Sequence, residues 1–327
     1  MGKSRSPRHG SMQFWPRVRS QRESPKVRSW NMSHSGLLGF VGYKAGMTHV
    51  QYTDPAKTSL TKGQVVSEPV TIVECPPITV IGIRVYSITT DNHLHVTAQF
   101  NAEKLPLEVR KRIPQSKNPK KLDESFDVSQ AHSVRLVVAT QPQLAGFGKK
   151  TSDIVEMAIG GSVQDQFTFA KDNLGKTISV EDVFKSGELI DTHAVTTGKG
   201  YQGPVKRFGV AIRQAKSEKV KRGPGSLGPW KGQGHIMYRI AMAGKMGYHL
   251  RTDYNKRIEL VSQDITKVNP VSGISRYGLV KTTFLLVRGS ISGPKKRLVT
   301  LTKAIRPNKR LDIGEVDLDY ISVEAQN

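Results

Sequence analysis

The residues most suggestive of chemistry are the glycines of residues 198–203, which read GKGYQG and match the G-x-G-x-x-G pattern of dinucleotide-binding loops. In such loops a helix N-terminus binds the pyrophosphate, and an acidic residue about twenty positions later binds the ribose. Pro204 is suited to begin a helix, but Gly209 interrupts it within two turns, and the only nearby acid, Glu218, lies among lysines. The pattern therefore favours a tight loop laid against RNA phosphates over a dinucleotide site.

No other spacing predicts catalysis or a metal centre. Residues 148–151 (GKKT) lack the upstream glycine and the adjacent Ser or Thr of a Walker phosphate loop. His93 and His95 would share one face of a strand, but no acidic or cysteine cluster accompanies them. Cys75 is the only cysteine, which excludes an intramolecular disulfide framework and cysteine-rich zinc sites. We therefore predict that the protein is not an enzyme, with no catalytic residue, no metal ligand, no cofactor and no small-molecule substrate.

Membrane attachment has one weak signal. Residues 1–6 (MGKSRS) fit the N-myristoylation template, which is short and matches often by chance. No window approaches eighteen uninterrupted apolar residues, and the first residues lack the apolar core of a secretory signal. We expect no membrane partner.

Charge is the dominant feature of the composition. The 327 residues include 50 Lys and Arg against 27 Asp and Glu, a formal net charge of +23 that implies a polyanionic partner. Residues 1–30 contribute +7 and residues 199–257 contribute +12, whereas the remaining 238 residues carry only +4. The sequence therefore predicts two basic segments attached to a nearly balanced globular part.

The two basic segments have the composition of RNA-binding segments. They are rich in proline or glycine and lack apolar periodicity, so we expect both to be disordered until they meet a partner. Aromatic residues are interleaved with the cations, as RNA binding requires, because cations neutralise phosphates while flat rings stack on unpaired bases. We predict that the following residues bind RNA: Arg5, Arg8, Phe14, Trp15, Arg17, Arg19, Arg22, Lys26, Arg28, Lys199, Tyr201, Lys206, Arg207, Arg213, Lys219, Lys221, Arg222, Trp230, Lys231, Arg239, Lys245, Tyr248, His249, Arg251, Lys256 and Arg257.

The rest of the chain predicts a mainly β fold with a helical insertion. Strand-like apolar patterns occur in residues 70–73, 78–88, 94–100, 258–261, 282–287, 297–301 and 316–323. Helical signals occur in residues 105–113 and 153–159, in a segment opened by the capping box of residues 162–165, and in another opened at residues 179–182. The simplest architecture is a β-barrel split in sequence, with an α/β domain inserted in it.

Six blocks, in order, resemble one known family over nearly the whole chain. They are residues 9–17 (HGSMQFWPR), 39–49 (GFVGYKAGMTH), 198–208 (GKGYQGPVKRF), 225–230 (GSLGPW), 244–257 (GKMGYHLRTDYNKR) and 284–297, which contains FLLVRGS and GPKKR. They are similar to the universal third protein of the large ribosomal subunit, the uL3 family, in its archaeal form. The absence of a long C-terminal basic tail favours the archaeal over the eukaryotic form.

The resemblance implies a translation-protein-type β-barrel with an inserted α/β domain and extended basic N-terminal and central segments. The implied parts are a basic arm at 1–36, the barrel at 37–100, 191–198 and 258–327, the inserted domain at 101–190, and the central extension at 199–257. It also implies a cytoplasmic protein of the large subunit that binds 23S-type rRNA and neighbouring large-subunit proteins, acts early in assembly, and extends the loop around Trp230 towards the peptidyl transferase centre.

Two departures from the family pattern concern the central extension. Residues 231–234 (KGQG) follow Trp230 where a proline is usual two residues on, and residues 215–219 (AKSEK) lack the histidine that is methylated in eukaryotic members. The alternatives that the residues leave open are a free RNA- or DNA-binding factor, a lipidated peripheral membrane protein and an oxidoreductase.

Overall fold

The computed structural model describes residues 9–56, 59–113, 131–216, 220–229, 232, 234–308, 310 and 314–324. The chain divides into two compact units. We call Arg22–Ala194 with Arg251–Asn327 the body, and Met1–Gln21 with Val195–Leu250 the basic unit. The described part is mainly β, as predicted, and no helix in it is long and apolar enough to cross a membrane.

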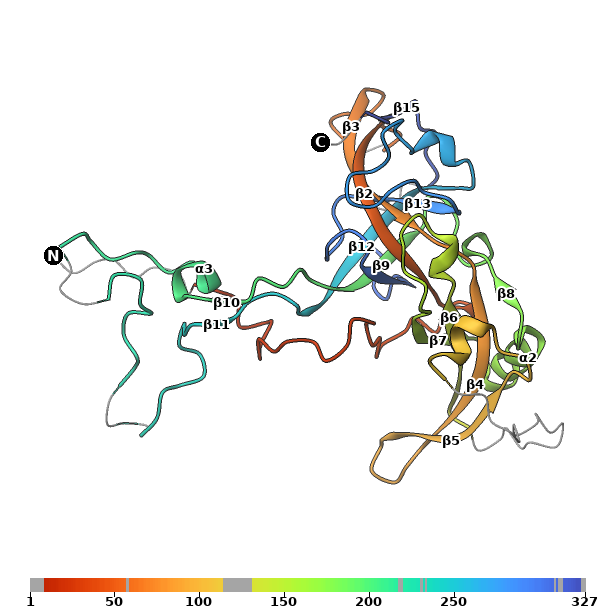
Figure 1. Ribbon diagram of the computed structural model, residues 1–327, viewed down its shortest axis with the longest axis horizontal. Coiled ribbons are helices and arrows are strands. Elements are labelled where there is room, and N and C mark those ends of the chain that lie inside the picture. The colour runs from red at the N-terminus through yellow and green to blue at the C-terminus, as the bar shows by residue number, and fades with distance from the viewer. Residues whose placement is uncertain are drawn as a thin grey trace. The chain divides into compact units, whose positions relative to one another are not determined.

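A seven-stranded sheet forms one part of the body, with the strand order β14-β9-β12-β13-β3-β2-β15 (Figure 1). Its strands are β2 (Gly39–Thr53), β3 (Val65–Glu74), β9 (Leu189–Val195), β12 (Leu250–Ser262), β13 (Phe284–Arg288), β14 (Leu298–Lys303) and β15 (Tyr320–Ile321). The strand β14 pairs antiparallel with β9 and also with β2, from Leu298 opposite Tyr43 to Thr302 opposite Gly39. The larger part of the basic unit, Val195–Leu250, lies in the sequence between β9 and β12.

A six-stranded sheet forms the other part of the body (Figure 1). Its order is β1-β7-β6-β4-β5, with β8 paired to β4. The strands are β1 (Gly36–Leu37), β4 (Ile78–Ile88), β5 (Leu94–Asn101), β6 (Ser133–Thr140), β7 (Ile154–Gly160) and β8 (Thr177–Ile178). The body also has a four-residue helix α1 (Leu107–Arg110), a longer helix α2 (Val163–Asn173), and 3-10 turns at Pro142–Leu144, Val180–Asp182 and Ile265–Lys267.

One hydrophobic core joins the two sheets. It contains Phe40 and Val41 from β2 together with Ile83 from β4, Leu136 from β6 and Met157 from β7, all essentially inaccessible to solvent. Burial of each such side chain contributes about 1.5–3 kcal/mol relative to exposure. A second cluster packs β3 and β13 against the segment that follows β12.

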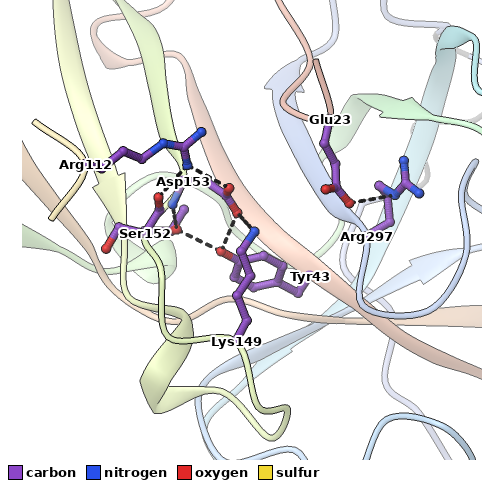
Figure 2. Close-up of polar contacts among 8 residues, drawn as sticks. Glu23, Tyr43, Arg112, Lys149, Ser152, Asp153 and Arg297 are labelled. Atoms are coloured by element: carbon purple, nitrogen blue, oxygen red, sulfur yellow. Dashed lines mark hydrogen bonds and ion pairs between the residues drawn. The ribbon is translucent and has the colours of Figure 1, made fainter. Parts of the chain in front are cut away.

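A polar junction also connects the sheets (Figure 2). The hydroxyl of Tyr43 on β2 donates to a carboxylate oxygen of Asp153 at 3.0 Å and lies 2.8 Å from the hydroxyl of Thr140, at the end of β6. The amide of Asp153 donates to Thr140 at 2.9 Å, and Lys149 and Arg112 form ion pairs with the Asp153 carboxylate. Burial, followed by the nearby Asp153 charge, raises the pKa of Tyr43 far above its usual range, so its hydroxyl is a permanent donor.

The helix α2 confirms the capping box predicted at residues 162–165. The Ser162 hydroxyl accepts from the Asp165 amide, and the Asp165 carboxylate accepts from the Ser162 amide, both at 3.3 Å. Gln166 fixes the helix against β6, because its side-chain oxygen accepts from the Val134 amide at 2.9 Å. The similar signal at residues 179–182 produces only a three-residue 3-10 turn.

The helix predicted for residues 153–159 is wrong, because this segment is the strand β7. Ser152 and Asp153 have the residue types of a helix start, but their polar groups serve the junction instead, where the Ser152 carbonyl accepts from Arg112 at 2.7 Å. The following β-branched residues pair with β6 and β1. A side chain at Gly160 would come within 1.7 Å of the His34 carbonyl, so this glycine permits close approach of two backbone segments rather than ending a helix.

Several predicted strands are confirmed, and one sheet boundary differs from the prediction. The strand β4 has the predicted bounds, while β5 and β13 agree to within two residues. The sequence analysis grouped β4 and β5 with residues 37–100, and in the structure these two strands hydrogen-bond in the six-stranded sheet, whereas β2 and β3 belong to the seven-stranded one. Burial patterns explain the missed strands, because β6 and β9 are buried on both faces and show no alternation.

A buried carboxylate anchors the loop that precedes β13. Glu74, at the end of β3, is inaccessible to solvent and accepts hydrogen bonds from the amides of Gly146, Lys281 and Thr282 at 2.7–3.0 Å, and from the Tyr277 hydroxyl. The Thr282 hydroxyl also donates to Glu74 at 3.2 Å. A side chain at Gly146 would meet the Leu279 carbonyl at 1.7 Å, so the two segments contact through their backbones.

The basic unit carries short elements in segments that were predicted to be disordered. Strand β10 (Tyr201–Gln202) pairs antiparallel with β11 (Gly244–Lys245), and helix α3 (Pro204–Phe208) follows β10 (Figure 1). Pro204 begins the helix and Gly209, at φ 71°, ends it, as their residue types predict. Disorder of the two basic segments before a partner binds stays a prediction.

Candidate nucleic-acid interface

The hairpin of the basic unit depends on glycine at one position. Gly247 has φ 75°, and a side chain there would lie 2.1 Å from the Thr197 carbonyl oxygen. The close approach lets the amide of Tyr248 donate to the same carbonyl, although the 3.4 Å distance makes this a weak bond. The glycines of residues 198–203 therefore belong to an antiparallel hairpin and a five-residue helix, not to a dinucleotide-binding βαβ unit.

An aromatic cluster joins the N-terminal arm to α3 within the basic unit. Trp15 stacks on Phe208 with ring centroids 6.0 Å apart, and Tyr238 meets Trp15 edge-on at 5.9 Å. The guanidinium of Arg17 lies 4.1 Å from the centroid of Phe208, a cation–π arrangement. Phe208 is buried in this cluster, whereas Tyr238 and Tyr201 remain 70% and 71% exposed, with free ring surface for stacking.

Two of the predicted cations hold the basic unit together. Arg17 donates to the Arg207 carbonyl at 2.8 Å, and Arg207 donates to the carbonyls of Met242 at 3.0 Å and Lys245 at 3.2 Å. Both side chains are half-buried. These hydrogen bonds set the position of each guanidinium within the basic unit.

Most of the other predicted cations of the basic unit are exposed. The structure places the following side chains on the surface of this unit: Arg19, Lys199, Lys206, Arg213, Lys221, Arg222, Arg239 and Lys245. Phe14 is 53% exposed as well. The described part of the basic unit thus combines exposed cations with exposed rings, which is the combination that RNA binding uses.

His249 has a positioning role that its residue type did not reveal. It is 8% exposed, and its Nδ1 lies 2.7 Å from the Val18 carbonyl of the N-terminal arm. Its neighbour Tyr248 has φ 56° and accepts from the Ser20 amide at 2.7 Å, while Arg19 lies over the Tyr248 ring at 5.4 Å. His249 is therefore mostly buried and holds the arm, while its contact with RNA stays a prediction.

Arg257 is buried and paired with a carboxylate, which the prediction of an RNA contact did not anticipate. Its side chain is 1% exposed and forms a bidentate pair with Glu259, with Nε to Oε1 at 2.8 Å and NH2 to Oε2 at 2.7 Å. It lies in the interior of β12 within the body, not on the extension. Arg251 and Lys256, also on β12, are partly buried, and burial lowers the pKa of Arg251.

The second half of the predicted N-terminal arm belongs to the body. Arg22, Lys26 and Arg28 are exposed, as an RNA contact requires. Between them Pro25 and Val27 are buried, and Trp30 packs against the main hydrophobic core. Residues 22–35 are therefore attached to the body by apolar burial, which the basic composition of residues 1–30 did not indicate.

Five predicted RNA-binding residues lie outside the residues that the structure describes: Arg5, Arg8, Lys219, Trp230 and Lys231. His95 lies in β5, while His93 lies in the preceding turn and its amide bonds to Thr89, so the expected shared strand face is not formed. Among the described residues, no group of three His, Cys, Asp or Glu side chains could hold a metal ion, and Cys75 is buried.

Comparison with known proteins assigns the chain to a family. The family model for ribosomal protein L3 matches residues 1–327. The large ribosomal subunit protein uL3 of Methanococcoides burtonii is 41% identical, over 99% of each chain. The uL3 proteins of Methanococcus vannielii (41% identical, over 99% of this chain and 98% of the relative) and Methanopyrus kandleri (39% identical, over 98% and 91%) are similar throughout as well. The chain therefore belongs to the ribosomal protein L3 family, whose members here are archaeal large-subunit proteins and not enzymes.

Proposed function

We propose that this protein is a structural constituent of the cytoplasmic large ribosomal subunit and binds 23S-type rRNA. The observation that carries the proposal is the exposed array of cations and aromatic rings on the basic unit, in a chain that matches the uL3 family from end to end. Such an array binds RNA mainly through phosphate contacts and counterion release, while the rings stack on unpaired bases. Catalysis on the ribosome would be carried out by the rRNA, as the resemblance to the family implies.

The finer roles follow from the resemblance. We propose that the protein binds early in assembly, contacts neighbouring large-subunit proteins, and extends residues 199–257 towards the peptidyl transferase centre. The order of the blocks at 198–208, 225–230 and 244–257 supports an extension that leaves the body at β9 and returns at β12. Exposed Tyr201, Tyr238 and Leu227 would meet RNA bases along it.

We also propose that the body is a closed β-barrel with an inserted α/β domain. Strand β14 pairs with both β9 and β2. The pairings therefore run in a ring from β14 through β9, β12, β13, β3 and β2 back to β14, which supports a closed barrel. The separate hydrogen-bonding of β4 to β8, with α2 packed beside β6, supports an inserted domain. We place its first strand at β4, ahead of the boundary at residue 101 that the sequence predicted.

A charge-neutralising variant of the basic unit tests RNA binding. In R19Q/K206Q/R222Q three exposed cations become neutral while the arginines that hold the unit, Arg17 and Arg207, are kept. We expect weaker binding to a large-subunit rRNA transcript, and a salt slope reduced by about two to three, since each phosphate contact contributes about 0.7–0.9 to it. The measurement is the dissociation constant over a series of salt concentrations.

The matched control is K62Q/K176Q/K185Q, which removes the same charge from exposed lysines of the body outside the basic segments. We expect this control to bind with nearly the slope of the unmodified protein. Equal slopes for all three proteins would contradict electrostatic binding through the basic unit.

A further inference from the structure

A third basic stretch lies within the body. Residues 265–310 contain eleven Lys and Arg and no Asp or Glu. The 238 residues outside the two basic segments carry +4 in total, so this stretch leaves −7 on the other 192. Because acidic residues elsewhere in the body cancel most of this positive charge, the net charge of the globular part is nearly balanced.

Three cations of this stretch form ion pairs with carboxylates. Arg288 pairs with Glu68, while Arg297 pairs with Glu23 and Lys303 with Glu188, both at 3.2 Å (Figure 2 shows the Glu23–Arg297 pair). In contrast, no carboxylate of the described residues forms an ion pair with Arg276, Lys295 or Lys296, which we call the body cation cluster. Arg276 and Lys296 are exposed and Lys295 is half-buried.

Two loops meet at the body cation cluster. The ammonium of Lys295 donates to the Ser275 carbonyl at 2.8 Å, next to Arg276 in the chain. Lys44 stabilises the loop of Lys295, because its ammonium donates to the carbonyls of Ile291 at 2.6 Å and Gly293 at 3.0 Å. The amide of Lys296 donates to the Lys44 carbonyl at 2.7 Å. The two loops therefore hold their cations by backbone contacts that supply no negative charge.

Burial and neighbouring positive charges lower the pKa values of the two lysines at this site. Burial and then the charge of Arg276 lower the pKa of Lys295. Burial is also the largest cause of the lowered pKa of Lys44, with Lys295 acting in the same direction and Asp253 opposing it. Like charges held together in this way disfavour the free protein, and a bound polyanion would offset their repulsion.

The backbone at the cluster is held in an uncommon conformation. Arg276 and Lys296 have φ values of 60° and 70°, in the left-handed region that side chains other than Asn and Asp rarely adopt. The Arg276 loop is fixed by the Ile274–Gly278 bridge and by Tyr277, whose hydroxyl donates to buried Glu74. Such conformations persist where the surroundings determine them, and they are concentrated at binding sites.

We propose that Arg276, Lys295 and Lys296 form a phosphate-binding site for the RNA backbone on the body, separate from the basic unit. The inference rests on the proposed function for the identity of the polyanion. The same stretch of sequence carries three further exposed cations, Lys267, Lys281 and Arg306. The rigid loops would bind without the ordering cost that a disordered segment has.

The test uses the full chain with three cations replaced, R276Q/K295Q/K296Q, and the matched control K62Q/K176Q/K185Q. Binding to a large-subunit rRNA transcript is measured between roughly 50 and 200 mM salt. We expect the cluster variant to bind more weakly by about a hundredfold or more at the lower salt, with a slope reduced by about two to three, and the control to be unchanged. A cluster variant with the unmodified slope would overturn the inference.

The salt slopes of the three proteins distinguish the absence of the body site from the absence of RNA binding altogether. If the unmodified protein binds with a steep salt slope and R19Q/K206Q/R222Q flattens it while the cluster variant does not, only the body site is lost. If the unmodified protein shows no salt-dependent binding, the proposed function itself fails, and this inference with it. Thermal unfolding without RNA checks the fold, and we expect the cluster variant to be at least as stable as the unmodified protein, because it removes repulsion.

A chemical readout distinguishes RNA from a small anion. Acetylation of Lys295 and Lys296 is followed by mass spectrometry with the rRNA transcript, and with inorganic phosphate at the same total phosphate concentration. We expect protection by the transcript only. Protection by neither, or equal protection by inorganic phosphate, would contradict a site for the RNA backbone.

Discussion

Replacing Arg257 by methionine should lower the free energy of unfolding by about 3–5 kcal/mol, because it leaves the Glu259 carboxylate buried without its partner. Both side chains are 1% exposed, so water cannot replace the two hydrogen bonds that are lost. Burial already acts to raise the pKa of Glu259, and Arg257 opposes this effect. Denaturant unfolding of the purified chain measures the change.

The double variant R257M/E259L is the control for this prediction. Replacing both partners of a buried ion pair by apolar residues is often neutral or stabilising, so most of the lost stability should return. The RNA salt slope of the double variant should equal that of the unmodified protein, since Arg257 is not a surface cation. A double variant as unstable as the single one would show that the shape of the arginine, rather than its charge, is what the fold requires.

Replacing Glu74 by alanine should cost about 3–5 kcal/mol in unfolding free energy. The change removes the acceptor of three backbone amides and two hydroxyls, and each buried donor left without a partner costs about 1–3 kcal/mol, with incomplete additivity. Because these bonds fix the loop that contains Arg276, the variant should also weaken RNA binding through the body cation cluster. Thermal unfolding and RNA titration of the same sample measure the two effects.

Two milder variants show which property of Glu74 matters. Glu74→Gln keeps the volume but turns one oxygen into a donor facing the Gly146 amide, so a loss of about 1–3 kcal/mol is expected from the mismatch. Tyr277→Phe removes a single donor and should cost about 1 kcal/mol. A fully stable Glu74→Gln protein would mean that packing, rather than hydrogen bonding, holds the loop.

Residue types and spacing over short stretches of sequence correctly predicted some of the helices and strands. The capping box at Ser162 and the extent of β4 were both predicted from residue types and spacing, and both are confirmed. The segment after Ser152 was misread because its cap-like residues bond to Tyr43 and Arg112, which are distant in sequence. The sequence also could not show that β4 and β5 belong to the six-stranded sheet, because sheet membership depends on pairing partners distant in sequence.

The candidate interface was predictable in its composition but not in its geometry. Net charge located the basic unit, yet residue type alone could not show that Arg257 and His249 are buried. It also could not show that Arg17 and Arg207 hold the arm and hairpin together. The body cation cluster was missed because charge was counted over the whole globular part, where acidic residues cancel the basic ones of residues 265–310.

Sedimentation through a sucrose gradient shows whether the tagged protein is an integral part of the large ribosomal subunit, when lysates of the cells it comes from are used after a high-salt wash. We expect stoichiometric recovery with the large ribosomal subunit, because cations distributed over the basic unit and the body would contact the RNA at many points. Release to the top of the gradient would contradict it, and would indicate a free or loosely bound nucleic-acid-binding factor.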